Sequence, residues 1–258
     1  MNQIGADAHT GSLAQVGAKD NHYERVLPIK LKMVGQETME RICEPEIMDE
    51  DEQVRAYAEA DFAQPHSTII ANAKELLTDN PMTGFALDLG CGPGDMVARL
   101  AEAFPKVQLE AVDGSKNMLR FAEVFLQNKK LLHQVILTHG VLPKVSLGRQ
   151  QYDFIFSSSL LHHLQDPMVL WSTIKTYSKP GTIIFVNDLI RPDYLEKAKE
   201  IVATYSGDEP TILKRDFYNS LLAAFTVDEV KTQLHQANLQ GLTIKMISDR
   251  HMAIYGKI

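Results

Sequence analysis

The chain has 258 residues and a formal net charge of −7, with 45% hydrophobic and 23% charged residues. This composition is typical of a globular protein. No cluster of Lys or Arg is longer than the pair Lys129-Lys130, so an electrostatic footprint for nucleic acid is not visible. No run approaches the roughly 18 apolar residues that a membrane span requires. Cys43 and Cys91 are too few for a disulfide framework, and the N-terminus lacks the basic-then-apolar order of a signal peptide. We therefore expect a cytoplasmic protein whose partner is neither nucleic acid nor a membrane.

The first 80 residues carry no strand pattern. Residues 1–22 are rich in small and polar residues without apolar periodicity, which predicts a disordered tail. Residues 23–80 are expected to form a helical N-terminal lid or cap. Within it we expect one helix over 49–62, ended by Pro65, and a second helix beginning at Ser67.

Two aromatic residues of this segment are candidates to close over a ligand. Tyr57 and Phe62 fall on the apolar face of the first predicted helix. A simple core stripe explains the same spacing, so both interpretations stay open.

From Gly84 onward, strand and helix patterns alternate. Such alternation predicts an α/β fold with right-handed crossovers and a doubly wound, mostly parallel sheet of seven strands. Two β-like runs at the end, around Ser248-Asp249-Arg250, predict an antiparallel C-terminal hairpin. We assign residues 81–258 to this domain and interpret residues 191–225 as a helical insertion on its substrate side.

The stretch Gly84–Asp95 reads GFALDLGCGPGD and predicts a strand, a glycine turn and a helix. This arrangement brings backbone N–H groups and a helix N-terminus close to a ligand. Asp88 lies in the predicted buried strand, where a carboxylate needs a donor, either a ligand's ammonium group or a backbone contact. A glycine turn that only permits tight packing is the alternative.

Asp113 ends the second predicted strand, about 20 residues beyond the glycine turn. In a doubly wound fold an acid at this position can accept both ribose hydroxyls of an adenosine. The alternative, a carboxylate capping the next helix, is served better by Ser115.

Three motifs, LDLGCGPGD, AVDGSKNML and YDFIFSSSLLHHLQDP, together resemble the class I S-adenosylmethionine-dependent methyltransferases. The motifs are most similar to those of the small-molecule branch that includes quinone-biosynthesis methyltransferases. The resemblance covers roughly residues 84–190. It implies S-adenosylmethionine as cofactor and S-adenosylhomocysteine as product. The third strand ends in Thr138-His139-Gly140-Val141, where the family usually places a polar or acidic residue beside the adenine, so backbone contacts are expected there instead.

The cofactor site expected from these motifs comprises Asp88, Gly90, Cys91, Gly92, Asp113, Gly114, Met118, Gly140, Val141, Ser157 and Ser158. Met118 is also a core position of its helix, and this alternative stays open.

His162 and His163 follow the fourth strand, at the edge where open α/β sheets bind ligands. Either histidine could take a proton from a hydroxyl or thiol acceptor, whereas a structural hydrogen bond is the alternative. Asp188 and Arg191 end the fifth strand, where the arginine could pair with a substrate carboxylate or phosphate, or form an ion pair that holds the loop. The other histidines show no metal-ligand spacing, so no metal site is expected.

We interpret the chain as a methyltransferase acting on a small molecule at oxygen, nitrogen, carbon or sulfur, chiefly by positioning and desolvation. A non-catalytic protein that binds S-adenosylmethionine or S-adenosylhomocysteine is one alternative. An NAD-dependent oxidoreductase is another, but the glycine spacing, Asp88 and the LHHL segment argue against it. The segments expected to shape the acceptor pocket, 23–80 and 191–225, carry no recognisable motif, and the sequence has no feature that specifies an oligomeric state.

Overall fold

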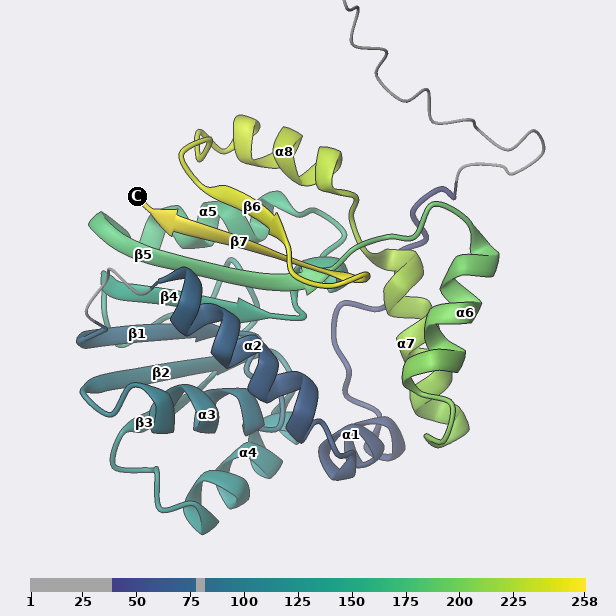
Figure 1. Ribbon diagram of the computed structural model, residues 1–258. Coiled ribbons are helices and arrows are strands. Elements are labelled where there is room, and N and C mark those ends of the chain that lie inside the picture. The colour runs from purple at the N-terminus through teal and green to yellow at the C-terminus, as the bar shows by residue number, and fades with distance from the viewer. Residues whose placement is uncertain (1–38, 78–81) are drawn as a thin grey trace, which may run out of the picture. The chain divides into compact units, whose positions relative to one another are not determined.

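The computed structural model describes residues 39–77 and 82–258 of the chain. A central seven-stranded sheet carries helices on both faces (Figure 1). Its strands are β1 (Gly84–Leu89), β2 (Val107–Asp113), β3 (Val135–His139), β4 (Tyr152–Ser158), β5 (Ser178–Leu189), β6 (Thr243–Met246) and β7 (His251–Lys257). The helices are α1 (Asp51–Glu59), α2 (Ala63–Leu76), α3 (Asp95–Ala103), α4 (Lys116–Asn128), the 3₁₀ turn η1 (Leu161–His163), α5 (Met168–Tyr177), α6 (Leu195–Tyr205), α7 (Thr211–Ala223) and α8 (Val227–Gln236).

The strand order is β3-β2-β1-β4-β5-β7-β6. Neighbours from β3 to β5 pair in parallel, whereas β7 runs antiparallel to both β5 and β6. The predicted doubly wound sheet of seven strands with a closing antiparallel hairpin is therefore confirmed. Because parallel strands end at the same edge, the segments after β1, β2, β4 and β5 meet at one edge, called the carboxyl edge below.

Each face of the sheet is sealed by a separate apolar cluster, because successive strand residues point to opposite faces. On one face Phe154, Phe156 and Phe185 pack with the apolar sides of α2 and α3. On the other face Ile155 and Ile184 pack with Leu and Ile side chains of α5 and α8 and with the fully buried Trp171. Burying each large apolar side chain stabilises the fold by about 1.5–3 kcal/mol, so both helical layers are held firmly on the sheet.

The N-terminal helices differ from the sequence prediction at their junction. Pro65 does not end the first helix; it lies in the first turn of α2, which begins at Ala63. A proline is tolerated there because the N–H groups of a first helical turn have no partner within the helix. Within the expected lid, residues 39–50 contain no helix, while residues 1–38, including the predicted tail, lie outside the described part.

Helices α1, α6 and α7 lie beyond the carboxyl edge (Figure 1), where α1 contacts α4 and α7, and α7 contacts η1. Within residues 39–77 and 82–258, none of the helices combines the length and apolar character needed to cross a bilayer.

Gly94 allows α3 and α4 to pack closely, and this predicts a stability effect. Its φ is +94°, and a Cβ there would stand 2.9 Å from the Cα of Ala122. We expect Gly94→Ala to lower the free energy of unfolding by about 2–4 kcal/mol, from left-handed backbone strain and overpacking. Urea denaturation measures it. Gly241→Ala is the control, because no described atom lies within 4 Å of a Cβ at Gly241; equal midpoints for the two variants would contradict the prediction.

Candidate active site

The loop between β1 and α3 turns through three glycines with positive φ: +78° at Gly90, +53° at Gly92 and +94° at Gly94. A Cβ at Gly90 would crowd the Leu160 side chain at 3.0 Å, and one at Gly94 would crowd Ala122. At Gly92, by contrast, no described atom lies within 4 Å of that position. Gly92 is therefore the position at which a ligand can come close to the backbone of this loop.

The Asp113 carboxylate ties this loop to the start of α4. Its Oδ2 accepts from the N–H of Gly92, and its Oδ1 accepts from the N–H of Ser115, both at 2.8 Å. The N–H of Cys91 also donates to the Val112 carbonyl at 2.9 Å. As the sequence predicted, Ser115 caps α4, accepting a hydrogen bond from the Met118 N–H.

Two acids, Asp88 and Asp113, lie beside this loop in surroundings that disfavour their ionisation. Asp88 is 1% exposed, and its Oδ2 has no hydrogen-bond partner among the described residues. Burial, with a smaller contribution from Asp113, raises the pKa of Asp88 to about 8. Burial also raises the pKa of Asp113, although the N–H groups of Ser115 and Gly92 oppose the shift. Ionising either carboxyl group is costly in the free protein, and a cation placed between them would lower that cost.

The other residues predicted near an adenosine gather beside Asp113. The N–H of Gly140 donates to the Asp113 carbonyl at 3.0 Å. Gly114 lies between the side chains of Val141 and Ile47, which would each be 3.5 Å from a Cβ at Gly114. Ile47 belongs to the segment preceding α1, so the N-terminal part of the chain covers this end of the site. Met118 is buried in the first turn of α4.

Ser157 and Ser158 lie at the end of β4. The Ser157 hydroxyl is buried and donates to the Leu89 carbonyl at 2.9 Å. The Ser158 hydroxyl accepts from Asn187 Nδ2 at 3.2 Å, and the Asn187 Oδ1 is buried without a partner among the described residues. Asn187 is thus a second buried polar group, besides Asp88, that faces the carboxyl edge with an unused acceptor.

Tyr57 and Phe62 lie next to one another, with ring centroids 4.9 Å apart. Burial raises the pKa of Tyr57 to about 12, and Asp113 and Asp95 add to the shift, so the hydroxyl faces the two acids at the glycine loop. The Phe62 ring is 5.2 Å from His66, whose Nδ1 lies 2.6 Å from Asp95 Oδ2. Tyr57 therefore lies near Asp113 and Asp95, with the Phe62 ring packed against it.

His162 and His163 lie in η1 at the same edge, and a buried carboxylate orients the first of them. Asp188 Oδ1 is 2.6 Å from His162 Nδ1 and accepts from the Leu189 N–H, while Oδ2 accepts from the Leu161 N–H. Burial alone would lower the pKa of His162, but the Asp188 carboxylate outweighs it and raises the pKa above its usual value. Conversely, burial would raise the pKa of Asp188, and His162 lowers it.

Glu44 completes this group from the N-terminal segment. Its Oε1 lies 3.5 Å from His162 Nε2 and 3.2 Å from His163 Nδ1. Burial raises the pKa of Glu44, partly offset by His162 and by the Ser220 hydroxyl, which donates to Oε1 at 3.1 Å. Burial and the neighbouring His162 lower the pKa of His163 to about 3, so this imidazole is neutral near pH 7.

Arg41 fastens the segment that carries Glu44. Its Nη2 donates to the carbonyls of His162 and Leu164 at 2.9 and 2.8 Å, and its Nε donates to the Ala223 carbonyl at 2.6 Å. The guanidinium also lies 3.9 Å from the centre of the Phe225 ring. One side chain thus joins the N-terminal segment, the histidine turn and the end of α7.

Arg191, expected as a substrate contact or an ion-pair partner, donates Nη2 to Glu229 Oε1 at 2.6 Å and Nη1 to the Ala224 carbonyl at 3.0 Å. It is 8% exposed, and these contacts anchor α8 to the end of β5. We therefore leave Arg191 out of the acceptor site proposed below.

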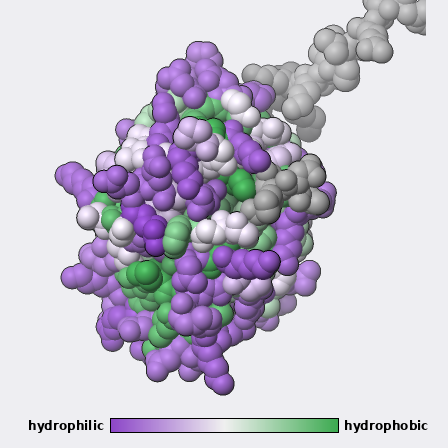
Figure 2. Space-filling model, turned by 90° about the vertical axis from the view of Figure 1, so that its left-hand side faces the viewer, coloured by the Kyte–Doolittle hydropathy of each residue, from purple (hydrophilic) through white to green (hydrophobic). Residues whose placement is uncertain are grey.

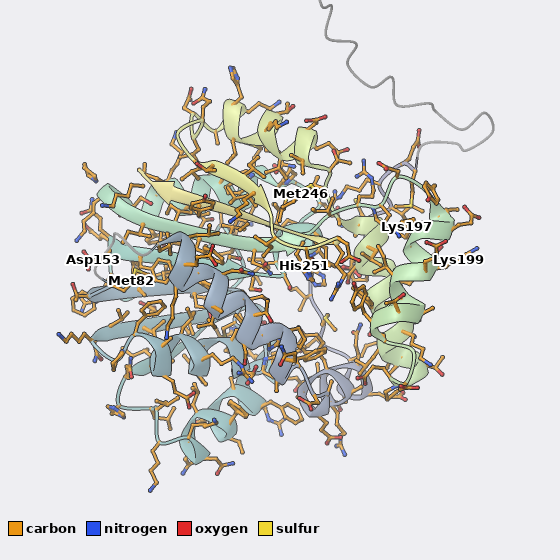
Figure 3. The ribbon with its side chains drawn as sticks, viewed as in Figure 1. Met82, Asp153, Lys197, Lys199, Met246 and His251 are labelled. Carbon is orange, nitrogen blue, oxygen red and sulfur yellow. The ribbon has the colours of Figure 1, made fainter. Side chains whose placement is uncertain are left out.

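His251 opens β7 and pairs with Leu189 at the end of β5 (Figure 3). Burial and Arg250 lower its pKa to about 4, against smaller opposite effects of Asp188 and Asp249. Met82 and Asp153 mark the other edge of the sheet in the same view.

That other edge holds two surface hollows of about 260 and 250 Å³, lined by residues such as Phe104, Lys106, Lys179 and Lys257. Figure 2 views this side, and hydrophilic residues cover most of it. The hollows lie at the amino ends of the strands, away from the glycine loop, so the topology and the buried acids place the candidate site at the carboxyl edge instead.

Residues 86–181 match the family model described as a methyltransferase domain. This part of the chain is a methyltransferase domain. It contains the glycine loop, Asp113 and both histidines of η1.

Two curated relatives that are methyltransferases match less than half of this chain. A trans-aconitate 2-methyltransferase from Azoarcus sp. (strain BH72) is 28% identical over 116 residues, which are 44% of this chain and 43% of the relative. A demethylmenaquinone methyltransferase from Geobacillus stearothermophilus is 30% identical over 108 residues, which are 42% of this chain and 46% of the relative. The chain thus spans less than half the length of these two relatives.

Solved structures share the fold over a longer stretch. The plantazolicin methyltransferase BpumL, in complex with a substrate analogue and SAH, has a TM-score of 0.60 and 16% identity, covering 80% of this chain and 89% of that chain. A SAM-dependent methyltransferase from Aquifex aeolicus has a TM-score of 0.56 and 17% identity, covering 81% and 98%. These likenesses confirm the methyltransferase-like fold of the sheet and its helices.

The sequence did not predict two residues that the fold brings to the methyltransferase domain, Arg41 and Glu44. Both lie in a segment without helical or strand periodicity, and Glu44 is more than 110 residues from the histidines that it meets. The residue types did not indicate these contacts, since an arginine and a glutamate in an irregular segment are usually exposed to solvent.

The Arg41 contacts predict local loosening when this side chain is shortened. We expect Arg41→Ala to speed amide hydrogen exchange in residues 39–50 and 161–165 and to lower the local opening free energy by about 2–4 kcal/mol, because several charge-assisted hydrogen bonds are lost. Hydrogen exchange followed by mass spectrometry measures this. Arg55→Ala, on the exposed side of α1, is the control; unchanged exchange in residues 161–165 of Arg41→Ala would contradict the prediction.

Proposed function

We propose that this protein is an S-adenosylmethionine-dependent methyltransferase that acts on a small-molecule acceptor. The observation that carries the proposal is the open backbone at Gly92 between two carboxylates whose ionisation is disfavoured in the free protein. The matching family model, the shared fold and the SAH bound to BpumL support it. The free cysteines and the acidic composition are consistent with a cytoplasmic enzyme without a nucleic-acid partner.

The residues at the glycine loop fit this cofactor. The unpartnered Oδ2 of Asp88 is suited to an ammonium group, and Asp113, at the end of β2, is suited to two ribose hydroxyls. The apolar side chains of Ile47 and Val141 lie close to Gly114, next to Asp113, and are suited to pack against a purine ring. When bound, S-adenosylmethionine supplies an electrophilic methyl group, and its transfer leaves the neutral thioether S-adenosylhomocysteine.

The same electrostatics argue against a nicotinamide cofactor. A dinucleotide places its pyrophosphate at the N-terminus of the helix after the glycine turn. Here the first turn of that helix carries Asp95, whose pKa is lowered by His66 and Arg99 although burial would raise it. An ionised Asp95 at this position would repel a pyrophosphate and attract a cation.

The acceptor is proposed to lie at the carboxyl edge between the glycine loop and the group formed by Glu44, His162 and His163. Asp188 holds His162 with Nε2 directed at Glu44, so this nitrogen can accept a proton from a hydroxyl or thiol group. Residues 39–50 and helices α1, α6 and α7 are proposed to exclude water from this space. Positioning and desolvation would then supply most of the rate enhancement.

Binding of the cofactor tests the proposal. We expect calorimetric titration to detect S-adenosylmethionine and S-adenosylhomocysteine, with affinity about 10–100-fold lower in Asp113→Asn because a charged acceptor is lost. Asp153→Asn is the matched control, since Asp153 lies at the opposite edge (Figure 3). Methyl transfer to a library of hydroxyl, amine and thiol acceptors then tests catalysis. Tight binding of NADH with no binding of S-adenosylmethionine would overturn the proposal.

Asp88 predicts a pH dependence of cofactor affinity. Its pKa of about 8 in the free protein means that most molecules carry a protonated Asp88 at pH 7, and a ligand ammonium group beside it lowers that pKa. Binding therefore releases a proton, and affinity falls by up to about tenfold per unit as the pH drops below about 7.5. Titrations in buffers of different ionisation enthalpy count the protons. Asp88→Asn should bind more weakly and lose this proton release; release that persists in the variant would exclude Asp88 as its source.

A further inference from the structure

Three potential ligand atoms converge at the carboxyl edge, apart from the glycine loop. Glu44 Oε1, His162 Nε2 and His163 Nδ1 come from two segments distant in sequence. We propose that these three residues bind a divalent transition-metal cation, with Zn²⁺ the best match to two imidazoles and one carboxylate. The sequence pattern alone predicted no metal site, because Glu44 lies far from the histidines along the chain.

The spacing of the three atoms suits a shared cation. All three lie within 4.8 Å of one another, with Glu44 Oε1 3.5 Å from His162 Nε2 and 3.2 Å from His163 Nδ1. Zinc bonds of about 2.0–2.2 Å at tetrahedral angles separate neighbouring ligand atoms by about 3.3–3.5 Å. A cation can therefore enter the group with small side-chain movements.

One ligand atom has no other use in the fold. His163 Nδ1 is buried and has no hydrogen-bond partner among the described residues, even though Glu44 is close by. A buried ring nitrogen without a partner is destabilising unless something else satisfies it. In the imidazole tautomer whose proton is on the other ring nitrogen, Nδ1 has the lone pair that a cation needs.

Neighbouring residues orient the other two ligands, His162 and Glu44, through hydrogen bonds, as is usual for metal ligands in proteins. Asp188 Oδ1 lies 2.6 Å from His162 Nδ1 and accepts a hydrogen bond from it. This contact holds the proton on Nδ1 and leaves the lone pair of Nε2 for the cation. The Ser220 hydroxyl donates to Glu44, and Arg41 holds the carbonyl of His162. His162 and Glu44 thus each have a second contact that orients them.

The charge balance also favours a doubly charged cation. Glu44 and Asp188 contribute two carboxylates, and Asp216 adds a further negative charge near Glu44. The positive charge of Arg41 lies near His162 and opposes a cation there. Its guanidinium, however, donates hydrogen bonds to backbone carbonyls and lies over the Phe225 ring. His251, also nearby, has a pKa of about 4 and stays neutral.

Three protein ligands leave at least one coordination position free, as in catalytic rather than structural zinc sites. That position suits water, or an oxygen or sulfur atom of a small molecule. If the proposed methyl transfer holds, the cation would bind the acceptor atom and lower its pKa. Cation binding and proton acceptance both require the lone pair of His162 Nε2, so only one of them can occur at a time. The effect of the cation on an acceptor rests on the proposed function, whereas the metal site itself does not.

Metal titration tests the site without any methyl donor. The full-length protein is stripped with a chelator, freed of the chelator and titrated with Zn²⁺ by calorimetry, with Co²⁺ absorption reporting nitrogen ligation. We expect one Zn²⁺ site per chain. The affinity for Zn²⁺ should be at least about 100-fold lower in Glu44→Gln and in His163→Gln, because removing a ligand should cost more affinity than the roughly 10–100-fold lost when a residue that only contacts a ligand is replaced. Mg²⁺ should bind far more weakly, since it prefers oxygen ligands.

Glu46→Gln is the matched control. Glu46 lies two residues from Glu44 and accepts from the Gln165 N–H, so this variant should bind Zn²⁺ like the wild type. Thermal unfolding of each metal-free variant shows whether the fold is kept. Absence of Zn²⁺ binding in the wild type, or equal affinity in the folded Glu44 and His163 variants, would overturn the inference. Zn²⁺ binding without S-adenosylmethionine binding would refute the proposed function alone.

Discussion

The carboxylate of Asp113 is the contact on which the candidate site depends. By accepting from the N–H groups of Gly92 and Ser115, it ties the glycine turn to the start of α4. The carboxyl edge of a parallel sheet gathers such acids because each strand ends there. Burial makes the ionised form of these acids costly in the free protein. A cationic cofactor bound beside them would offset that cost.

A second carboxylate, Asp188, does the equivalent for the other half of the edge. It holds η1 through the Leu161 N–H and orients His162 through Nδ1. The proposed cofactor half and the proposed acceptor half of the edge are therefore organised in the same way, by a carboxylate that accepts from backbone N–H groups. They differ in what remains free: an oxygen of Asp88 in the first, and ring nitrogens facing Glu44 in the second.

The N-terminal segment joins these halves. Arg41 and Glu44 contact the histidine turn, Ile47 lies over Gly114, and Asp49 accepts from the Ser115 hydroxyl at 2.7 Å. Nine residues, 41–49, thus run along the edge from the histidine turn to the start of α4.

Much of the fold followed from the sequence, because strand and helix periodicities and the glycine turn are local patterns. They determined the parallel sheet, the closing hairpin, the Ser115 cap and the positions of Asp88, Asp113 and the histidines at strand ends. Pro65 was misjudged because a proline both ends helices and begins them, and neighbouring residues do not distinguish the two. The meeting of Glu44 and Arg41 with η1, and the pairing of Arg191 with Glu229, were decided by tertiary structure, since contacts between irregular segments far apart in the chain leave no periodic trace.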